Sequence, residues 1–199
     1  MTRKLLLVFV KNPRLGAVKT RLAASIGDQK ALRVYQLLLD HTLRIASRMD
    51  MDKAVYYSDF IPASDAWRKN GFQQFLQTGS DLGERMSNAF RNAFIRGYDE
   101  VVLIGSDCYE LEIHHLTSAF ESLLKKQVVL GPATDGGYYL IGMNAHYPTL
   151  FQQKNWSTSS VFAETLESLK QAQLTWGELE QRSDIDDLND LMQHDDLFL

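Results

Sequence analysis

Short runs that are mostly apolar alternate along this chain with longer stretches of helical periodicity. Six runs resemble strands, at residues 5–10, 54–58, 72–77, 101–104, 128–130 and 138–142. Continuous apolar character is typical of strands buried on both faces. Between the runs, apolar residues recur at steps of three and four, as in residues 30–49. The alternation predicts an α/β fold with three α/β/α layers and a mostly parallel central sheet.

Length and charge narrow the class of protein. The 199 residues suit one domain over residues 1–199, and the net charge of −4 argues against a broad nucleic-acid surface. Cys108 is the only cysteine, so no intrachain disulfide is expected. The first apolar run is too short for a signal peptide or a membrane span. We therefore expect a soluble, cytoplasmic protein.

A basic loop follows the first predicted strand. Within KNPRLGAVKTR, four cations follow one another closely, Lys11, Arg14, Lys19 and Arg21, and Gly16 permits close backbone approach to a ligand. Lysine and arginine donate to phosphate oxygens. The loop matches neither GxxxxGK[ST] nor GxGxxG, and a solvated basic loop is the alternative. Its place after a buried strand favours a ligand site.

Asp107 follows the buried run 101–104, where open α/β sheets bind ligands. Mg²⁺ takes oxygen ligands, typically one or two carboxylates with substrate phosphates. The alternative is an aspartate that caps the next helix. Cys108 suits a buried structural thiol better than a nucleophile. Nearby Glu110 and Glu112 suit solvated acids at a helix start.

Two later stretches add further polar candidates. Asp135, Gly136 and Gly137 follow the run 128–130, and Asp135 could accept hydrogen bonds from sugar hydroxyls. A plain Asp-Gly turn is the alternative. A late acidic stretch contains Asp184, Asp186 and Asp187, for which a solvated capping run is the default. The sharper interpretation is that Asp186 joins Asp107 on a metal.

Other residues allow simpler interpretations. Asp81 can cap a helix, with Glu84 three residues later. Trp156 could form an aromatic wall or simply pack before a helix. None of the five histidines shows zinc-site spacing, and the pair His114-His115 is expected on a helix surface.

Six blocks together resemble a bacterial family of nucleotide-diphospho-sugar transferase-like proteins. They are VFVKNPRLGAVKTRL, DLGERM, LIGSDCYEL, LGPATDGGYYLIG, NWSTSSV and SDIDDLNDL, and they span nearly the whole chain. Members are described as glycosyltransferases, some linked to arsenosugar biosynthesis. The resemblance implies the GT-A or nucleotidyltransferase-like fold, a superfamily that includes guanylyltransferases.

The resemblance also implies roles for individual residues. Lys11, Lys19 and Arg21 match first-loop residues that meet nucleotide phosphates. Asp107 matches a metal-binding aspartate, and Asp186 matches a late acid that is a second metal ligand in some members. Further matches place residues 79–86, including Asp81, near the nucleobase, and Asp135, Gly136 and Gly137 at the sugar or acceptor side.

The chain departs from the family pattern at two positions. Tyr109 stands where proline is usual, which would loosen the loop or fill the pocket differently. Asp187 stands where threonine is usual, so it either adds charge beside the metal or faces solvent.

The leading expectation is a transferase that uses Mg²⁺ or Mn²⁺ and passes a sugar from a nucleotide sugar to a small acceptor. Asp107 holds the metal, Lys19 and Arg21 stabilise phosphate charge, and Asp135 orients or deprotonates the acceptor. The expected binding site also includes six further residues, namely Lys11, Gly16, Gly136, Gly137, Asp81 and Trp156. The alternatives are nucleotidyl transfer with release of pyrophosphate and nucleotide binding without catalysis. Oligomeric state stays open.

Overall fold

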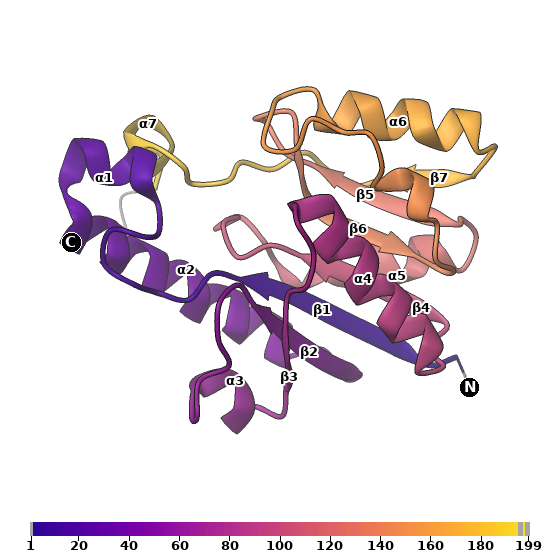
Figure 1. Ribbon diagram of the computed structural model, residues 1–199, viewed down its shortest axis with the longest axis horizontal. Helices are drawn as coiled ribbons and strands as arrows, with labels where there is room; N and C mark the ends of the chain where they lie inside the picture. The colour runs from indigo at the N-terminus through magenta and orange to yellow at the C-terminus, as the bar shows by residue number, and fades with distance from the viewer. Residues whose placement is uncertain (1, 195–196, 198–199) are drawn as a thin grey trace.

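A single mixed sheet forms the centre of the protein in the computed structural model, which describes residues 2–194 and residue 197 (Figure 1). Its seven strands lie in the order β3-β2-β1-β4-β6-β5-β7. They are β1 (Lys4–Val10), β2 (Asp52–Tyr57), β3 (Gln73–Leu76), β4 (Glu100–Ile104), β5 (Val128–Pro132), β6 (Tyr138–Met143) and β7 (Trp176–Glu178).

The pairing confirms the predicted mostly parallel sheet. Strand β1 runs parallel to β2 and β4, and β3 and β7 join the sheet in parallel to β2 and β5. Only β6, among the strands described, pairs antiparallel, with β4 on one side and β5 on the other. Strand β7 was not predicted, because its three residues carry no apolar run.

Helices cover both faces of the sheet and complete the three layers (Figure 1). Helices α2 (Asp28–Ser47), α3 (Ala66–Lys69) and α5 (Ile113–Leu123) pack on one face. Helices α4 (Leu82–Ile95) and α6 (Val161–Gln171) pack on the other with the 3₁₀ turn η1 (Pro148–Leu150). Helices α1 (Thr20–Ile26) and α7 (Leu188–Leu191) pack with α2 in a third apolar cluster.

Two structural links position the candidate site. Strands β1 and β4 are parallel neighbours, so the segments that leave Val10 and Ile104 start side by side. The late segment 182–186 returns to the same edge. Arg182 bridges Ala133 beyond β5, and the Ile185 amide donates to the Asp107 carbonyl at 3.0 Å. Asp107, after β4, and Asp186, in the late segment, therefore lie close together in space.

None of the helices within residues 2–194 is long and apolar enough to cross a membrane.

Candidate active site

The ammonium group of Lys19 lies between two carboxylates. Its Nζ is 2.7 Å from Asp107 Oδ1 and 3.1 Å from Asp186 Oδ1, and the lysine side chain is 5% exposed. Arg21 donates to the other oxygen of Asp186 at 2.5 Å but is 71% exposed. The cluster thus joins the basic loop, the end of β4 and the late acidic stretch. We refer to Lys19, Arg21, Asp107 and Asp186 as the Lys19 cluster.

Lys19 reaches this place through an unusual backbone conformation. It precedes α1 with φ of 49° and ψ of 45°, in the left-handed region that few residues other than glycine adopt. Burial alone would lower the pKa of Lys19. The carboxylates of Asp107 and Asp186 outweigh burial and raise the pKa above its ordinary value of 10.5. The lysine is therefore a fixed positive charge at neutral pH.

Asp184 is a third acid at the same edge, and the sequence analysis did not select it. Alternation along the extended segment places it on the same side as Asp186, while Ile185 packs into the third apolar cluster. Burial, and then the charge of Asp107, raises the pKa of Asp184 to about 8, although Lys19 opposes the shift. The shift therefore reflects burial first and the neighbouring negative charge second.

Tyr35 ties the basic loop to the end of β4 and was also missed. Its hydroxyl accepts from the Lys11 amide at 2.8 Å and lies 3.2 Å from Ser106 Oγ. Burial raises the pKa of Tyr35 far above its ordinary value, so the phenol stays protonated. Its helical spacing in α2 looked like core packing, which hid the polar role of the hydroxyl.

A cavity of about 480 Å³ opens beside the Lys19 cluster. Its lining includes Asp107, Asp186 and Arg21 of the Lys19 cluster, together with Asp135, Gly137 and Trp156. Gln77, Arg85 and Met86 also line it. A smaller cavity of about 120 Å³ adjoins Lys11 and Lys19. Volumes of a few hundred cubic ångströms suit small-molecule ligands.

The Asp-Gly-Gly turn contributes Asp135 and Gly137 to the lining of this cavity, and one carboxylate oxygen of Asp135 is already hydrogen-bonded within the turn. Asp135 Oδ1 accepts from the Gly137 amide at 2.8 Å, as in a tight turn. Gly136 has φ of +88°, and an added Cβ would lie 2.1 Å from the Ser159 carbonyl oxygen. The close approach that Gly136 permits is therefore to the segment before α6. Trp156 packs against Gly83, where a Cβ would lie 2.3 Å from the indole.

Of three further predicted binding residues, only one lines the cavities beside the Lys19 cluster. Lys11 lines both cavities beside the Lys19 cluster. Gly16 lines none of the described cavities, and its φ of +72° accounts for the glycine. Asp81 caps α4 by accepting from the Glu84 amide at 2.8 Å, as the sequence predicted. It lines a separate cavity of about 600 Å³, with Trp156 between that cavity and the first.

Several open alternatives are resolved by the contacts. Helix α5 takes Glu112 as its N-cap, so Asp107 does not cap it. Cys108 is buried, and burial raises the pKa of its thiol far above the ordinary value. Asp187 caps α7 by accepting from the amides of Asn189 and Asp190. Tyr109 packs against His41 and His194, which accounts for a ring at this position.

The residues of the Lys19 cluster fit a hard divalent cation. Asp107 and Asp186 direct oxygens to one point, which the lysine ammonium occupies. Oxygen ligands of this kind suit Mg²⁺ and Mn²⁺. Asp184 lines the same cavity as Asp107 and Asp186, so the lining holds a third acidic side chain near this point. Asp107 and Asp186 are the residues that could hold the ion.

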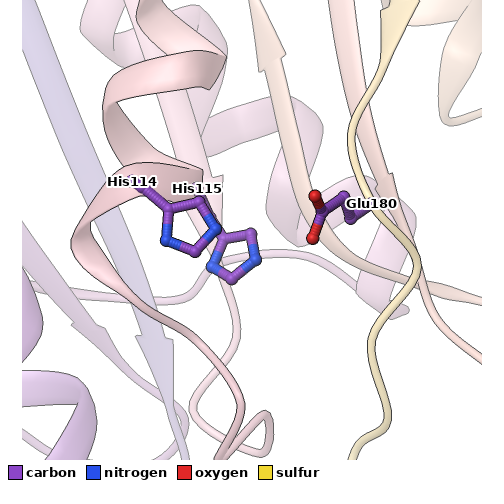
Figure 2. A group of neighbouring side chains, drawn as sticks. All are labelled: His114, His115 and Glu180. Carbon is purple, nitrogen blue, oxygen red and sulfur yellow. The ribbon is translucent and has the colours of Figure 1, made fainter.

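A second cluster combines His114, His115 and Glu180, whose ligand atoms lie within 4.8 Å of one another (Figure 2). The expectation of a surface histidine pair is wrong for His115, which is 3% exposed. Its Nδ1 accepts from the Glu112 amide at 2.9 Å in a capping box. Its Nε2 faces the Arg182 Nε–H, also at 2.9 Å. A neutral imidazole has one nitrogen lone pair, so both donors already compete for it.

Comparisons with known proteins bear on the family and the fold of this chain. A family model described as "Uncharacterized protein conserved in bacteria (DUF2064)" matches residues 39–158, more than half of the chain. A crystal structure from Desulfovibrio desulfuricans G20, described as that of a candidate nucleotide-diphospho-sugar transferase, superposes with a TM-score of 0.87. It is 34% identical, and the match covers 96% of this chain and 85% of that chain. No curated protein matches the chain.

More distant structures share the fold. A cytidylyltransferase from Leptospira borgpetersenii serovar Hardjo-bovis has a TM-score of 0.59 at 14% identity, covering 96% of this chain and 84% of its own. A CMP:2-keto-3-deoxy-manno-octonic acid synthetase complexed with CTP has a TM-score of 0.61 at 8% identity, covering 96% of both chains. At these identities they show the fold alone, whereas the family match and the 34% identical relative show the family. The chain belongs to this bacterial family of nucleotide-diphospho-sugar transferase-like proteins.

Proposed function

We propose that this protein is a transferase that uses a nucleotide-activated donor together with Mg²⁺ or Mn²⁺, and that it transfers a sugar to a small acceptor. The Lys19 cluster carries the proposal, because it places two carboxylates and two cations at the edge of a cavity of about 480 Å³. That edge is where parallel α/β sheets bind ligands. The 34% identical relative is described by the same class of donor.

The roles of the residues follow from charge. Asp107 and Asp186 would hold the divalent cation, which supplies neutralisation of the diphosphate as it leaves. Lys19 and Arg21 stabilise the negative charge that develops on phosphate oxygens. Lys11 lines the same cavity and adds a further cation. Asp135, Gly137 and Trp156 lie on the cavity wall where the acceptor would bind.

Nucleotidyl transfer is the second candidate, and one observation favours it. A general base is needed to deprotonate a sugar-accepting hydroxyl, but not when an anionic phosphate is the nucleophile. Asp135, the proposed base, already accepts from the Gly137 amide through Oδ1, so this oxygen is engaged in holding the turn. The phosphate of a small acceptor would then attack the α-phosphate of a nucleoside triphosphate, and pyrophosphate would leave.

Product analysis tests both candidates. The protein is incubated with nucleotide sugars or nucleoside triphosphates, metal and a panel of small acceptors, and phosphorus NMR follows the products. Glycosyl transfer releases a nucleoside diphosphate, whereas nucleotidyl transfer releases pyrophosphate. A thermal-shift screen of the same donors, with and without Mg²⁺, precedes it. If no donor stabilises the fold at millimolar concentration, both candidates fail.

A further inference from the structure

The Lys19 ammonium occupies the point at which Asp107 and Asp186 direct their oxygens. We propose that Lys19 is an internal counter-ion, which holds the place between these carboxylates until a divalent cation enters together with a nucleotide. The inference rests on the proposed function, because it concerns the cation and the nucleotide of that site. It makes tight metal binding depend on the nucleotide.

Electrostatics gives the first step. A divalent cation that contacts both carboxylates would lie close to the ammonium, which is 2.7 Å and 3.1 Å from their oxygens. Two positive charges at such short distance repel strongly, and more so where water is excluded. The Lys19 side chain is 5% exposed, so solvent screens the repulsion poorly. The cation therefore binds both carboxylates only when the ammonium moves away.

The second step concerns where the ammonium goes. Away from Asp107 and Asp186, a buried ammonium needs another anion or water, since an unpaired buried charge is costly. The adjoining cavity of about 120 Å³ is lined by Lys11, Lys19 and Arg21, so it offers cations in addition to the same two aspartates. Phosphate oxygens placed there would take over the ammonium. Nucleotide and metal thus assist each other's binding.

Arg21 provides a matched comparison within the same cluster. It contacts only the outer oxygen of Asp186 and is 71% exposed. A metal bound at the facing Oδ1 leaves that contact in place, and solvent screens the guanidinium. Removal of Arg21 should therefore change metal affinity much less than removal of Lys19.

Calorimetric titration with Mn²⁺ alone tests the inference. Lys19→Met should bind Mn²⁺ about tenfold or more tightly than the wild type, a normal size for coupling between two ligands. Lys19→Arg keeps the charge and should bind as weakly as the wild type. Arg21→Met should change the affinity by less than about threefold, as expected for an exposed pair. Lys19→Gln replaces Lys19→Met if the latter fails to fold, which thermal unfolding reports.

Two further measurements test whether Mn²⁺ binds at Asp107 and whether metal and nucleotide assist each other's binding. Adding Asp107→Asn to Lys19→Met should abolish the gained Mn²⁺ binding. In thermal-shift assays with GTP, CTP and UTP, Mn²⁺ plus nucleotide should stabilise the wild type beyond the sum of the separate shifts. That excess should shrink in Lys19→Met.

Equal Mn²⁺ affinity in the wild type, Lys19→Met and Lys19→Gln overturns the inference, and so does tight binding by Lys19→Arg. A nucleotide-dependent shift in the wild type would still support the proposed function. Conversely, tighter Mn²⁺ binding by Lys19→Met with no response to any donor would support the counter-ion and overturn the nucleotide site. The two failures are therefore distinguishable.

Discussion

Two clusters in this molecule gather metal-ligating side chains around a basic residue. In the Lys19 cluster, an ammonium bridges Asp107 and Asp186. In the second, which we call the His115 cluster (His114, His115, Glu180 and Arg182), a guanidinium bridges Glu180 and His115. Both join segments that are distant in the sequence. By residue type alone, the histidines make the second cluster the better transition-metal site.

The number of lone pairs that are free to bind a metal makes the Lys19 cluster the better metal site. Carboxylates keep several acceptor sites, so Asp107 and Asp186 can serve a lysine or a metal. His115 has one lone pair for two donors, the Glu112 amide and Arg182. Arg182 also pairs with Glu180, so it holds both potential ligands. The comparison teaches that a cluster of ligating residue types needs uncommitted lone pairs before it can bind a metal.

The largest expected effect separates the two clusters by catalysis. Asp107→Asn should lower turnover about 100-fold or more, because it removes charge from the phosphate side of the site. Glu180→Gln should leave turnover unchanged, because Glu180 does not line the described cavities. Phosphorus NMR measures product formation, and circular dichroism confirms that both variants fold. An equal loss in the two variants would contradict the assignment of the active site.

The next effect concerns stability at the His115 cluster. His115→Ala should lower the free energy of unfolding by about 1–2 kcal/mol, because it removes the capping contact to the Glu112 amide. His115→Gln should lose less, since an amide oxygen can still accept that bond. Urea unfolding at pH 7.5 measures both. If alanine and glutamine cost the same, the capping role of His115 is wrong.

A smaller expected effect is that the free energy of unfolding depends on pH through His115. Burial, followed by the charges of His114 and Arg182, lowers the pKa of His115 below 6.5, while the Glu112 backbone contact and Glu180 oppose the shift. The unfolded state therefore binds the proton more tightly. The contribution to stability is present above about pH 6.5 and is lost as pH falls through the folded-state pKa. Wild-type stability should fall more than that of His115→Gln between pH 7.5 and 5.5.

The smallest expected effect is an absence of gained zinc binding. Arg182→Met removes the basic residue of the His115 cluster, as Lys19→Met does in the Lys19 cluster. The lone pair of His115 still accepts the hydrogen bond from the Glu112 amide and is not available to a metal. Calorimetry should therefore give a zinc Kd above about 10 μM. His114→Ala in the same background is the control. Submicromolar zinc binding that His114→Ala removes would show that the capping contact yields to a metal.

The sequence predicted much of the sheet because its central strands, such as β1 and β4, are buried on both faces. Residues 101–104 were predicted as a strand from continuous apolar character, and β4 contains them. Strand β7 carries Trp176, Gly177 and Glu178, and packing at a sheet edge defines it more than local pattern does. Helix α3 begins at Ala66, because the side chain of Asp65 caps it by accepting from the Arg68 amide.

The sequence also selected Lys19, Arg21, Asp107 and Asp186, from their positions after strands and their resemblance to a family, and it paired Asp107 with Asp186 as metal ligands. It did not predict the contact of Lys19 with these aspartates, because Lys19 and Asp186 are 167 residues apart and meet only when residues 182–186 return to β4.

The sequence by itself determined the alternating strands and helices and the charged residues that leave their ends, since local periodicity and polarity are properties of neighbouring residues. Only the tertiary structure decided which charges neutralise each other and which lone pairs stay free. Those outcomes depend on distances of a few ångströms between segments far apart in the chain. Lys19 between its aspartates and His115 between its two donors show this dependence most directly.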